Sequence, residues 1–444
     1  MISRKSETKI KNWIQDSKKA LLVSGARQVG KTHSIRRCLD ELGCDFLEIN
    51  LIEQPELVPV IEASMSVEDL IINLSTATNY SFTKGETILF IDEIQEAKDI
   101  VTRIKFWVDE GSFRYILSGS LLGVELKNLR SAPVGYLEEI KMFPLDFEEF
   151  LLASNVQPEV IAHLRDCFDN ERGVSDLIHN KMMEHFRRYL IVGGMPEAVK
   201  EYINSGDINK VTEIQLSIIE MYKRDFTKYE AEDKKLMIIS IYDLVPSQLL
   251  KQNRRFNYSD IKKGLRFERV ESSFLWLASA GVVIPTYNAT EPRISLNQNR
   301  KSSLVKLYCS DVGLLTSSYG NALRTKILID DGKVNLGGIY ENAVAQELNS
   351  HGFPTYFYNS HKNGELDFLI EKAASVIPIE VKSGKDYYVH SALTKTVANK
   401  EYEVEKAFVL SNYNVKTEGE IVYLPVYMTM FISDDAALPV LREI

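Results

Sequence analysis

Eight residues near the start of the chain have the types and spacing of a phosphate-binding loop. The segment GARQVGKT fits the pattern G-x-x-x-x-G-K-[ST]. Its glycines let the backbone curl so that main-chain N–H groups face phosphate oxygens, and the N-terminus of a following helix favours negative charge. We expect Lys31 to reach the β and γ phosphates of ATP and the Thr32 hydroxyl to take one Mg²⁺ position. The predicted nucleotide-binding residues are Gly25, Ala26, Arg27, Gln28, Val29, Gly30, Lys31 and Thr32.

Two adjacent acids further along the chain suit the catalytic half of such a site. Asp92 and Glu93 follow the apolar stretch Leu89–Ile91. Asp92 is expected to hold Mg²⁺ through water, and Glu93 to orient and deprotonate the attacking water. Adjacent carboxylates repel each other without a cation, which weighs against a merely solvated strand end. We expect the strand that carries them to neighbour the strand before the loop.

The next apolar stretch ends in two serines. Ser118 or Ser120 is positioned to act as a polar sensor of the γ phosphate. The same residues are equally typical of a simple turn. We assign Ser120 to catalysis with Lys31 and Glu93. Arg130, in the loop that follows, is the candidate for an arginine that stabilises the transition state.

A third constellation lies near the C-terminus, in the pattern D-x(12)-E-x-K. It consists of Asp367, Glu380 and Lys382. The two strands that carry them are expected to form a hairpin. Strand alternation places Glu380 and Lys382 on one face, and Asp367 can approach from the neighbouring strand. Two carboxylates there would hold a divalent cation, and the lysine would stabilise or deprotonate a water that attacks a phosphodiester. A surface ion pair is the alternative, but the apolar neighbours of these residues indicate central strands.

The elements that carry the first two sets alternate between strand and helix. Strands are predicted at Ala20–Ser24, Asp45–Asn50, Thr87–Ile91 and Arg114–Ser118, with helical stretches between them. This order predicts a parallel sheet covered on both faces.

The rest of the chain changes character twice. Residues 146–228 are predicted to be helical with a turn at Gly193–Pro196, and residues 235–286 read as helices running into a glycine and a short strand. That last arrangement is typical of a winged helix. A helix at Gly338–Leu348 and strands at Thr355–Tyr358, Leu366–Ile370 and Ile377–Val381 are expected to follow.

The composition and charge of the chain restrict the classes of protein to which it can belong. The 444 residues carry a formal net charge of -9, with 45% hydrophobic and 26% charged residues, as in an ordinary globular protein of several domains. The chain lacks the run of roughly 18 apolar residues that a membrane span needs. The mixed-charge N-terminus does not resemble a signal peptide, and the four cysteines have no metal-ligand spacing. These features predict a cytoplasmic protein that does not contact membranes.

One local excess of positive charge runs against the acidic total. Between Lys251 and Arg269 the aromatic residues Phe256, Tyr258 and Phe267 interleave with cations. The pattern is compatible with contacts to a nucleic-acid backbone, and equally with a solvated helical face. The cations are Lys251, Arg254, Arg255, Lys262, Lys263, Arg266 and Arg269.

Taken in order, the motifs SGARQVGKT, LFIDEIQ, YILSGS, PLDFEEFL, YLIVGGMPEAV and IPIEVKSGK resemble a family of prokaryotic AAA-type P-loop ATPases. The resemblance covers almost the whole chain. It implies an AAA-type α/β core over residues 1–150, a helical lid over 151–230, a winged-helix segment over 231–300, and an α/β restriction-endonuclease-like domain over 301–444.

The resemblance also bears on single residues. The C-terminal region resembles the PD-(D/E)XK nucleases, and Glu341 matches their helix acid, which would join Asp367 and Glu380 as a metal ligand with Lys382 as the catalytic lysine. Relatives carry Gly-Arg where this chain has Gly135 and Tyr136. If that arginine contacts nucleotide in them, another residue must do so here.

We therefore expect an ATPase that uses ATP and Mg²⁺ to rearrange a DNA-binding or nuclease-like C-terminal region. A nucleotide-gated protein that binds or cleaves nucleic acid is one alternative. A switch in which ATP binding sets the state, with an inactive nuclease-like module, is another. Ring-forming relatives take an arginine from a neighbouring copy, so the sequence leaves monomer and homo-oligomer both open.

Overall fold

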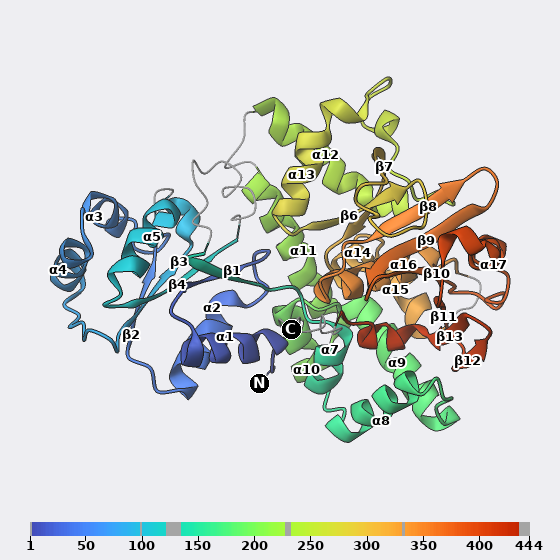
Figure 1. The fold of residues 1–444 in the computed structure, drawn as a ribbon, viewed down its shortest axis with the longest axis horizontal. Helices are drawn as coiled ribbons and strands as arrows, with labels where there is room; N and C mark the ends of the chain where they lie inside the picture. Colours follow the sequence, from blue (N-terminus) through green and yellow to red (C-terminus); the bar gives the residue numbers. More distant parts are fainter. Residues whose placement is uncertain (1, 98–99, 121–134, 227–231, 331–333, 435–444) are drawn as a thin grey trace, which may run out of the picture. The chain divides into compact units, whose positions relative to one another are not determined.

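A computed structural model of the chain describes residues 2–97, 100–120, 135–226, 232–330 and 334–434. Contacts between residues divide the chain into two units (Figure 1). The N-terminal unit is Ser3–Phe143 with Ser279–Gly281, and the C-terminal unit is Pro144–Ala278 and Val282–Ile444 with Met1–Ile2. The finer division of the C-terminal unit into a lid, a winged helix and a nuclease-like module stays a prediction.

The N-terminal unit alternates strands with helices. A short 3₁₀ turn, Ile94–Glu96, follows the third strand. The other described elements, in chain order, are α1 (Lys5–Asp16), β1 (Ala20–Ser24), α2 (Lys31–Glu41), β2 (Phe46–Asn50), α3 (Leu57–Ala63), α4 (Val67–Thr78), β3 (Ile88–Asp92), α5 (Ile100–Glu110), β4 (Arg114–Gly119) and β5 (Leu137–Lys141).

Five parallel strands form the sheet of this unit, in the order β2-β3-β4-β1-β5. The four strands predicted from apolar runs are confirmed, and β5 is additional. Ala20 and Leu22 share a core with α3, α4 and α5, while Leu21 and Val23 are fully buried on the opposite face of β1. Such double burial explains why β1 reads as an uninterrupted apolar run.

One expectation about this sheet is wrong. β3, which carries Asp92, does not neighbour β1, because β4 lies between them. Leu117 of β4 pairs with Leu22 on one side and with Ile91 on the other. Local patterns gave the strands but not their order, which long-range pairing decides.

The C-terminal unit contains most of the helices and a second sheet. Short 3₁₀ turns lie at Tyr258–Asp260, Phe267–Arg269, Lys400–Tyr402 and Val426–Phe431. The helices are α7 (Phe147–Ala153), α8 (Pro158–Asp169), α9 (Asp176–Val192), α10 (Pro196–Ser205), α11 (Ile208–Phe226), α12 (Glu232–Leu249), α13 (Glu271–Ser279), α14 (Val312–Ser317), α15 (Asn321–Leu328), α16 (Gly337–Ser350) and α17 (Ser391–Ala398). The strands are β6 (Val283–Ala289), β7 (Arg300–Cys309), β8 (Tyr356–Ser360), β9 (Gly364–Lys372), β10 (Ser375–Val381), β11 (Ala407–Ser411), β12 (Lys416–Glu418) and β13 (Ile421–Pro425).

The predicted helices and their break at Gly193 are confirmed. α9 ends at Val192, and Gly193 has a φ of 70°, a conformation that L-residues with a side chain rarely adopt. A Cβ on Gly193 would also overlap the carboxylate of Asp311. The main-chain N–H of Gly194 donates to that carboxylate at 2.5 Å. Glycine is therefore required here by both conformation and space.

The second sheet is mixed and has the order β12-β13-β11-β10-β9-β8-β6-β7. β9 and β10 form the predicted antiparallel hairpin. β6, expected at the end of the winged-helix segment, pairs with β7 and β8 and so belongs to this sheet. α16 contacts β6, β7 and β10. The helix that carries Glu341 therefore packs on the strands that carry the C-terminal polar residues.

Candidate functional site

The loop predicted to bind phosphate lies between β1 and α2. Gly25 and Gly30 have φ values of 144° and 94°, which glycine adopts without strain. A Cβ on Gly25 would overlap the carbonyl oxygen of Met142. The structure thus requires glycine at Gly25 through both backbone conformation and close approach of another strand end.

Lys31 is almost completely buried in this loop, with 7% of its surface exposed. Its Nζ lies 3.1 Å from the carbonyl oxygen of Gly25 and 2.9 Å from that of Ala26. Burial lowers the pKa of Lys31 to about 8, against which the nearby Glu93 and Asp92 act. Because the hydrogen-bond acceptors of this buried ammonium are neutral carbonyl oxygens, its charge can also pair with the negative charge of a nucleotide phosphate.

Asp92 joins the loop to the acidic strand end. The Thr32 hydroxyl donates to its Oδ2 at 2.7 Å, and the Ser118 hydroxyl donates to its Oδ1. The main-chain N–H of Glu93 also donates to Oδ1, at 3.0 Å. Although β4 separates β3 from β1, the hydroxyl and the carboxylate predicted to share Mg²⁺ are in direct contact.

Glu93 sits in an unusual backbone conformation. Its φ and ψ are 57° and 47°, a left-handed geometry that is uncommon outside glycine and is often found at functional positions. The Gln95 side-chain amide donates to its carboxylate at 2.5 Å. The backbone and Gln95 together fix the carboxylate predicted to act as general base.

The two serines at the end of β4 make different contacts. Ser118 is fully buried and orients Asp92, whereas Ser120 accepts a hydrogen bond from Arg27 Nε at 3.3 Å. Ser120 therefore connects to the phosphate loop itself. Arg130 lies outside the described residues.

Arg4 also supports the loop and was not predicted. Its guanidinium donates to the carbonyl oxygen of Val29 at 2.8 Å and to that of Phe143 at 2.6 Å. It is one of the buried charged residues of the unit. Arg4 precedes the first helix and belongs to no motif, so only the fold reveals that it anchors the loop.

The C-terminal carboxylates do come together. The main-chain N–H of Val381 donates to Asp367 Oδ2 at 2.9 Å, and Lys382 Nζ lies 2.7 Å from Glu380 Oε1. Burial, followed by the charge of Asp367, raises the pKa of Glu380 to about 8. Glu380 Oε2 is buried without a hydrogen-bond partner among the described residues.

Glu341 on α16 meets residues that sequence reasoning missed. Arg254 contacts its Oε1, and the Tyr308 hydroxyl donates to its Oε2 at 2.9 Å. Lys306 Nζ lies 3.7 Å from the same Oε2. Burial, followed by the charge of Asp367, raises the pKa of Glu341 to about 7. A lysine within the apolar run Leu304–Leu307 was the available sequence signal for this contact.

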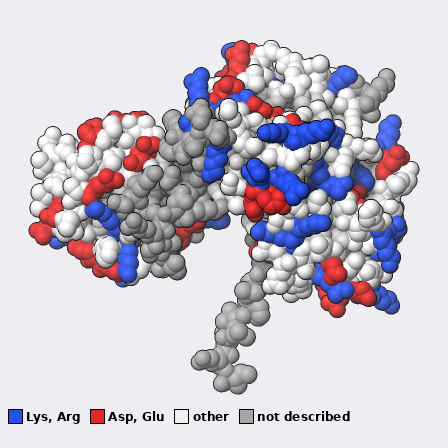
Figure 2. Space-filling view, turned by 90° about the horizontal axis from the view of Figure 1, so that it is seen from above, with Lys and Arg blue, Asp and Glu red and all other residues white. Residues whose placement is uncertain are grey.

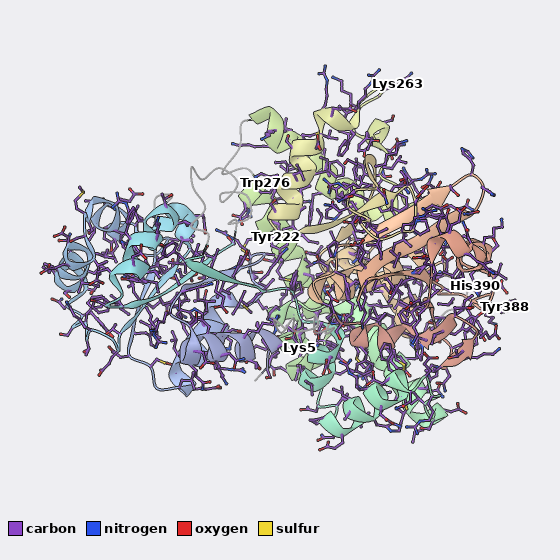
Figure 3. The ribbon with its side chains drawn as sticks, in the orientation of Figure 1. Lys5, Tyr222, Lys263, Trp276, Tyr388 and His390 are labelled. Atoms are coloured by element: carbon purple, nitrogen blue, oxygen red, sulfur yellow. The ribbon has the colours of Figure 1, made fainter. Side chains whose placement is uncertain are left out.

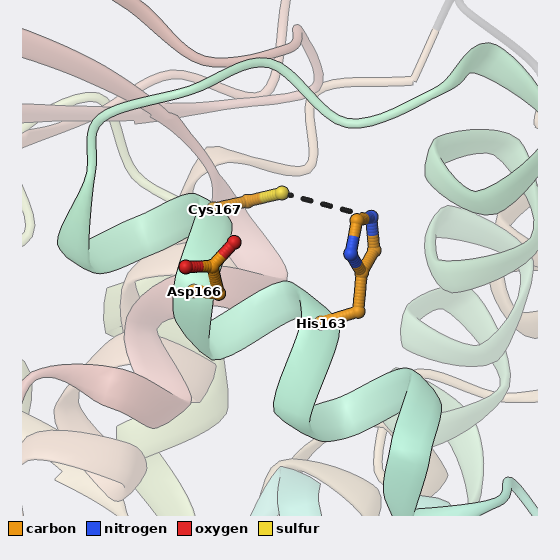
Figure 4. Close-up of side chains that lie close together, drawn as sticks. All are labelled: His163, Asp166 and Cys167. Carbon is orange, nitrogen blue, oxygen red and sulfur yellow. Dashed lines mark hydrogen bonds between the residues drawn. The ribbon is translucent and has the colours of Figure 1, made fainter.

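Two other groups of three residues have ligand atoms within 4.8 Å of one another among the described residues. One is His163, Asp166 and Cys167 on a single stretch of α8 (Figure 4). Cys167 Sγ lies 3.7 Å from His163 Nε2, and Asp166 pairs with Arg172. Neither His163 nor Asp166 is buried, and the ion pair accounts for the carboxylate.

The second group is Asp146, Glu347 and His351. Asp146 caps α7, and Glu347 accepts from the main-chain N–H of Phe147 at 3.2 Å. His351 Nδ1 lies 2.7 Å from the carbonyl oxygen of Ile432. These contacts give each member a structural role at the start of α7 and the end of α16.

The aromatic residues of the basic segment at residues 251–269 pack in its core. Phe256 and Phe267 are buried and pack with Tyr258 against Phe274, so they are core residues and not exposed stacking surfaces. Lys251 pairs with Asp260. These aromatic rings therefore form the core of the segment.

Besides Lys251, which pairs with Asp260, four cations of this segment are exposed. Figure 2 looks onto the side where Figure 1 places α12 and α13, and it shows Lys and Arg gathered on that face of the C-terminal unit. Lys263 points outward from the unit (Figure 3). These four exposed cations are Lys262, Lys263, Arg266 and Arg269.

Comparison with known families matches three parts of the chain. Residues 17–151 match an AAA domain. Residues 183–324 and 336–428 match two domains of unknown function (DUF8612 and DUF4143). The N-terminal unit therefore carries an AAA-type, P-loop ATPase-like domain, in agreement with its parallel sheet and its loop.

Individual relatives are distant. The chain is 26% identical over 248 residues to increased recombination centers protein 6 of Candida dubliniensis, covering 51% of this chain and 86% of that protein. A Walker-type ATPase of Pyrococcus abyssi is 16% identical, covers 72% of this chain and 96% of its own, and has a TM-score of 0.44. The Orc1 protein of Aeropyrum pernix, solved in complex with DNA, is 15% identical over 74% and 95%, with a TM-score of 0.28. Both scores are too low to support a fold or a function.

No helix in the described part of the chain combines the length and apolar character that crossing a bilayer requires.

Proposed function

We propose that the N-terminal unit hydrolyses ATP in a reaction that requires Mg²⁺. The observation that carries this proposal is the 2.7 Å contact between the Thr32 hydroxyl and Asp92 Oδ2. These are the two oxygen ligands through which P-loop ATPases hold Mg²⁺. The buried Lys31 beside them and the fixed carboxylate of Glu93 supply the other polar groups that the reaction needs.

Each residue has a role in the proposed reaction. Lys31 and the main-chain N–H groups of the loop bind the β and γ phosphates and neutralise their charge. Mg²⁺, held by Thr32 and Asp92, would stabilise the charge that develops on the phosphate oxygens. Glu93 orients a water and accepts its proton as the water oxygen bonds to the γ phosphorus. The bond between that phosphorus and the β–γ bridging oxygen breaks, and ADP leaves.

The test compares Glu93→Gln with Glu96→Gln. Glu96 lies on the same turn but is exposed, so its variant controls for the loss of a charge. We expect Mg²⁺-dependent ATP turnover in the wild type and in Glu96→Gln, and a loss of about 100-fold or more in Glu93→Gln with ATP binding retained. Equal turnover in all three proteins, or none in the wild type, would reject the proposal.

For the whole chain, we propose that the nucleotide state alters the C-terminal unit. The supporting observation is the course of the chain. The Met142 main-chain N–H donates to the carbonyl oxygen of Ser24 at 2.8 Å, and the Met142 carbonyl lies against Gly25. The C-terminal unit begins two residues later, at Pro144. A phosphate that moves the loop would thus act directly on the segment that leads into the other unit.

Two partner proposals accompany this one. The exposed cations at Lys262, Lys263, Arg266 and Arg269 support binding of a nucleic-acid backbone by the C-terminal unit. The homo-oligomer left open by the sequence stays a proposal as well. Sedimentation of the full chain with and without ATP tests this proposal. A ring that assembles on nucleotide would sediment as a larger species when ATP is present.

A further inference from the structure

The resemblance of the C-terminal region to PD-(D/E)XK nucleases implies a divalent cation held by Glu341, Asp367 and Glu380. Such a cation requires oxygen ligands that converge on one point at about 2.0–2.6 Å. The groups with ligand atoms within 4.8 Å of one another do not include these three acids. Their side chains are buried and close, but they do not form the expected set of ligands.

A buried lysine lies beside two of these acids, Glu341 and Asp367. Lys306 on β7 has no exposed surface. Its Nζ is 2.8 Å from Glu365 Oε1, 3.7 Å from Asp367 Oδ1 and 3.7 Å from Glu341 Oε2. It reaches these positions over Phe357 of β8, with the ammonium 5.2 Å from the ring centroid. One protein cation therefore faces carboxylates from two different elements, β9 and α16.

The residue pattern on the strands shows that this arrangement is built into the fold. Lys306 and Tyr308 are two residues apart on β7 and both contact Glu341. Glu365 and Asp367 are two residues apart on β9 and both face Lys306. Side chains at this spacing share one face of a strand. Strand alternation on β7 and β9 thus directs the cation and the acids toward each other.

Protein cations also supply part of the positive charge that a divalent cation would bring to these acids. The nuclease set of Glu341, Asp367, Glu380 and Lys382 carries two uncompensated negative charges, which a divalent cation would balance. Here Lys306 and Arg254 add two positive charges to that set and Glu365 adds one negative charge, so the formal net charge changes from −2 to −1. Both oxygens of Glu341 already face protein donors, Arg254 at one and Tyr308 with Lys306 at the other. A divalent cation would have to displace at least one of these contacts.

We propose that the Lys306 ammonium, with Arg254, takes the place of the divalent cation, so that the C-terminal module is a metal-independent scaffold and not a nuclease. The ion pairs fix α16 to β7 and β9 across the sheet. This assignment is independent of ATP hydrolysis by the N-terminal unit. Glu380, the third acid of the expected metal site, pairs with Lys382, and its Oε2 is buried without a hydrogen-bond partner in the described part of the chain.

The direct test titrates MnCl₂ into the nucleotide-free full chain, by calorimetry, and compares the wild type with Asp367→Asn and Glu380→Gln. We expect no Mn²⁺ binding that depends on either acid. The same proteins are then given single- and double-stranded DNA with Mn²⁺, and we expect no cleavage that Asp367→Asn removes. Mn²⁺ binding by the wild type that either substitution abolishes would overturn the proposal, as would Asp367-dependent cleavage.

The second test removes the lysine. Lys306→Met should lower the Tm of the protein by about 5–15 °C, because it leaves buried carboxylates uncompensated, and Mn²⁺ should restore much of that loss. The double variant Lys306→Met/Glu341→Gln, which removes one charge of each sign, should recover stability without Mn²⁺. Lys301→Met, at an exposed position of the same strand, is the control and should change little. A Lys306→Met protein as stable as this control would contradict the proposal; if the single variant does not fold, the double variant and the titration of the wild type still decide it.

Discussion

The hydroxyl of Thr32 donates to Asp92 Oδ2 at 2.7 Å, which joins the start of α2 to the end of β3 across an intervening strand. Thr32→Val keeps the shape of the side chain but removes the hydroxyl. We expect it to weaken the Mg²⁺ dependence of ATP binding and to lower turnover about 100-fold, because the cation loses a ligand. Thr32→Ser should retain most activity. A Thr32→Val enzyme with the wild-type response in a MgCl₂ titration would contradict the assignment.

Removal of the buried charge on Lys31 should affect stability and ligand binding in opposite directions. Because burial lowers its pKa from 10.5 to about 8, the folded state disfavours the charged form, and this cost is fully present below about pH 8. Lys31→Met should therefore raise the free energy of unfolding of the nucleotide-free protein by about 1–3 kcal/mol at pH 7. The gain should shrink as the pH rises from 8 toward 10.5, where the unfolded chain also loses the proton.

Addition of MgATP should reverse that order. The wild type should gain about 3 kcal/mol at saturating nucleotide, whereas Lys31→Met should gain little. Urea unfolding of both proteins at pH 7 and pH 10, with and without MgATP, measures these free energies of unfolding. A variant that is less stable than the wild type without nucleotide at pH 7 would show that burial of the charge is not a net cost.

Arg4 should act as a positioning residue for the phosphate loop. Arg4→Ala removes hydrogen bonds to the carbonyl oxygens of Val29 and Phe143. We expect a loss of about 1–3 kcal/mol in the stability of the N-terminal unit and a several-fold increase in KM for ATP, with a smaller effect on kcat. Lys9→Ala, at an exposed position of the helix that follows Arg4, is the matched control. Stability and KM unchanged from that control would exclude the role.

Alanine substitutions at two glycines distinguish the effect of a steric clash from that of backbone strain alone. Gly25→Ala places a Cβ against the Met142 carbonyl at a φ of 144°, so it should abolish detectable ATP binding. At Gly43, with a φ of 61°, the same substitution meets no atom within 4 Å and should cost only about 1 kcal/mol with ATP binding intact. Isothermal titration with a nonhydrolysable ATP analogue measures both. Normal affinity in Gly25→Ala would mean that the loop relaxes around the added methyl group.

The proposed nucleic-acid contact predicts a change in salt dependence. The double substitution Lys262→Glu/Lys263→Glu should weaken DNA binding at all sequences and lower the slope of log affinity against log salt by about 1–2. Lys326→Glu/Lys395→Glu makes the same change at exposed lysines elsewhere in the C-terminal unit. Equal affinities and slopes for the two double variants in fluorescence anisotropy would remove this segment from the interface.

The sequence by itself determined the local parts of the nucleotide site. A phosphate loop depends on its own glycines and on the strand and helix beside it, so consecutive residues from Gly25 to Thr32 were enough to predict it. The apolar run before Asp92 likewise predicted the strand that positions this carboxylate. The β9–β10 hairpin followed from alternation and a short connection, which are also local properties.

Only the tertiary structure decided which distant residues meet. The insertion of β4 between β3 and β1 depends on pairing between strands far apart in the chain, and no local pattern encodes that order. Arg4 anchors the loop from outside every motif. Lys306 contacts Glu341 and Asp367 because β7, β9 and α16 pack together, and this long-range packing determines whether the acids face a metal ion or a protein cation.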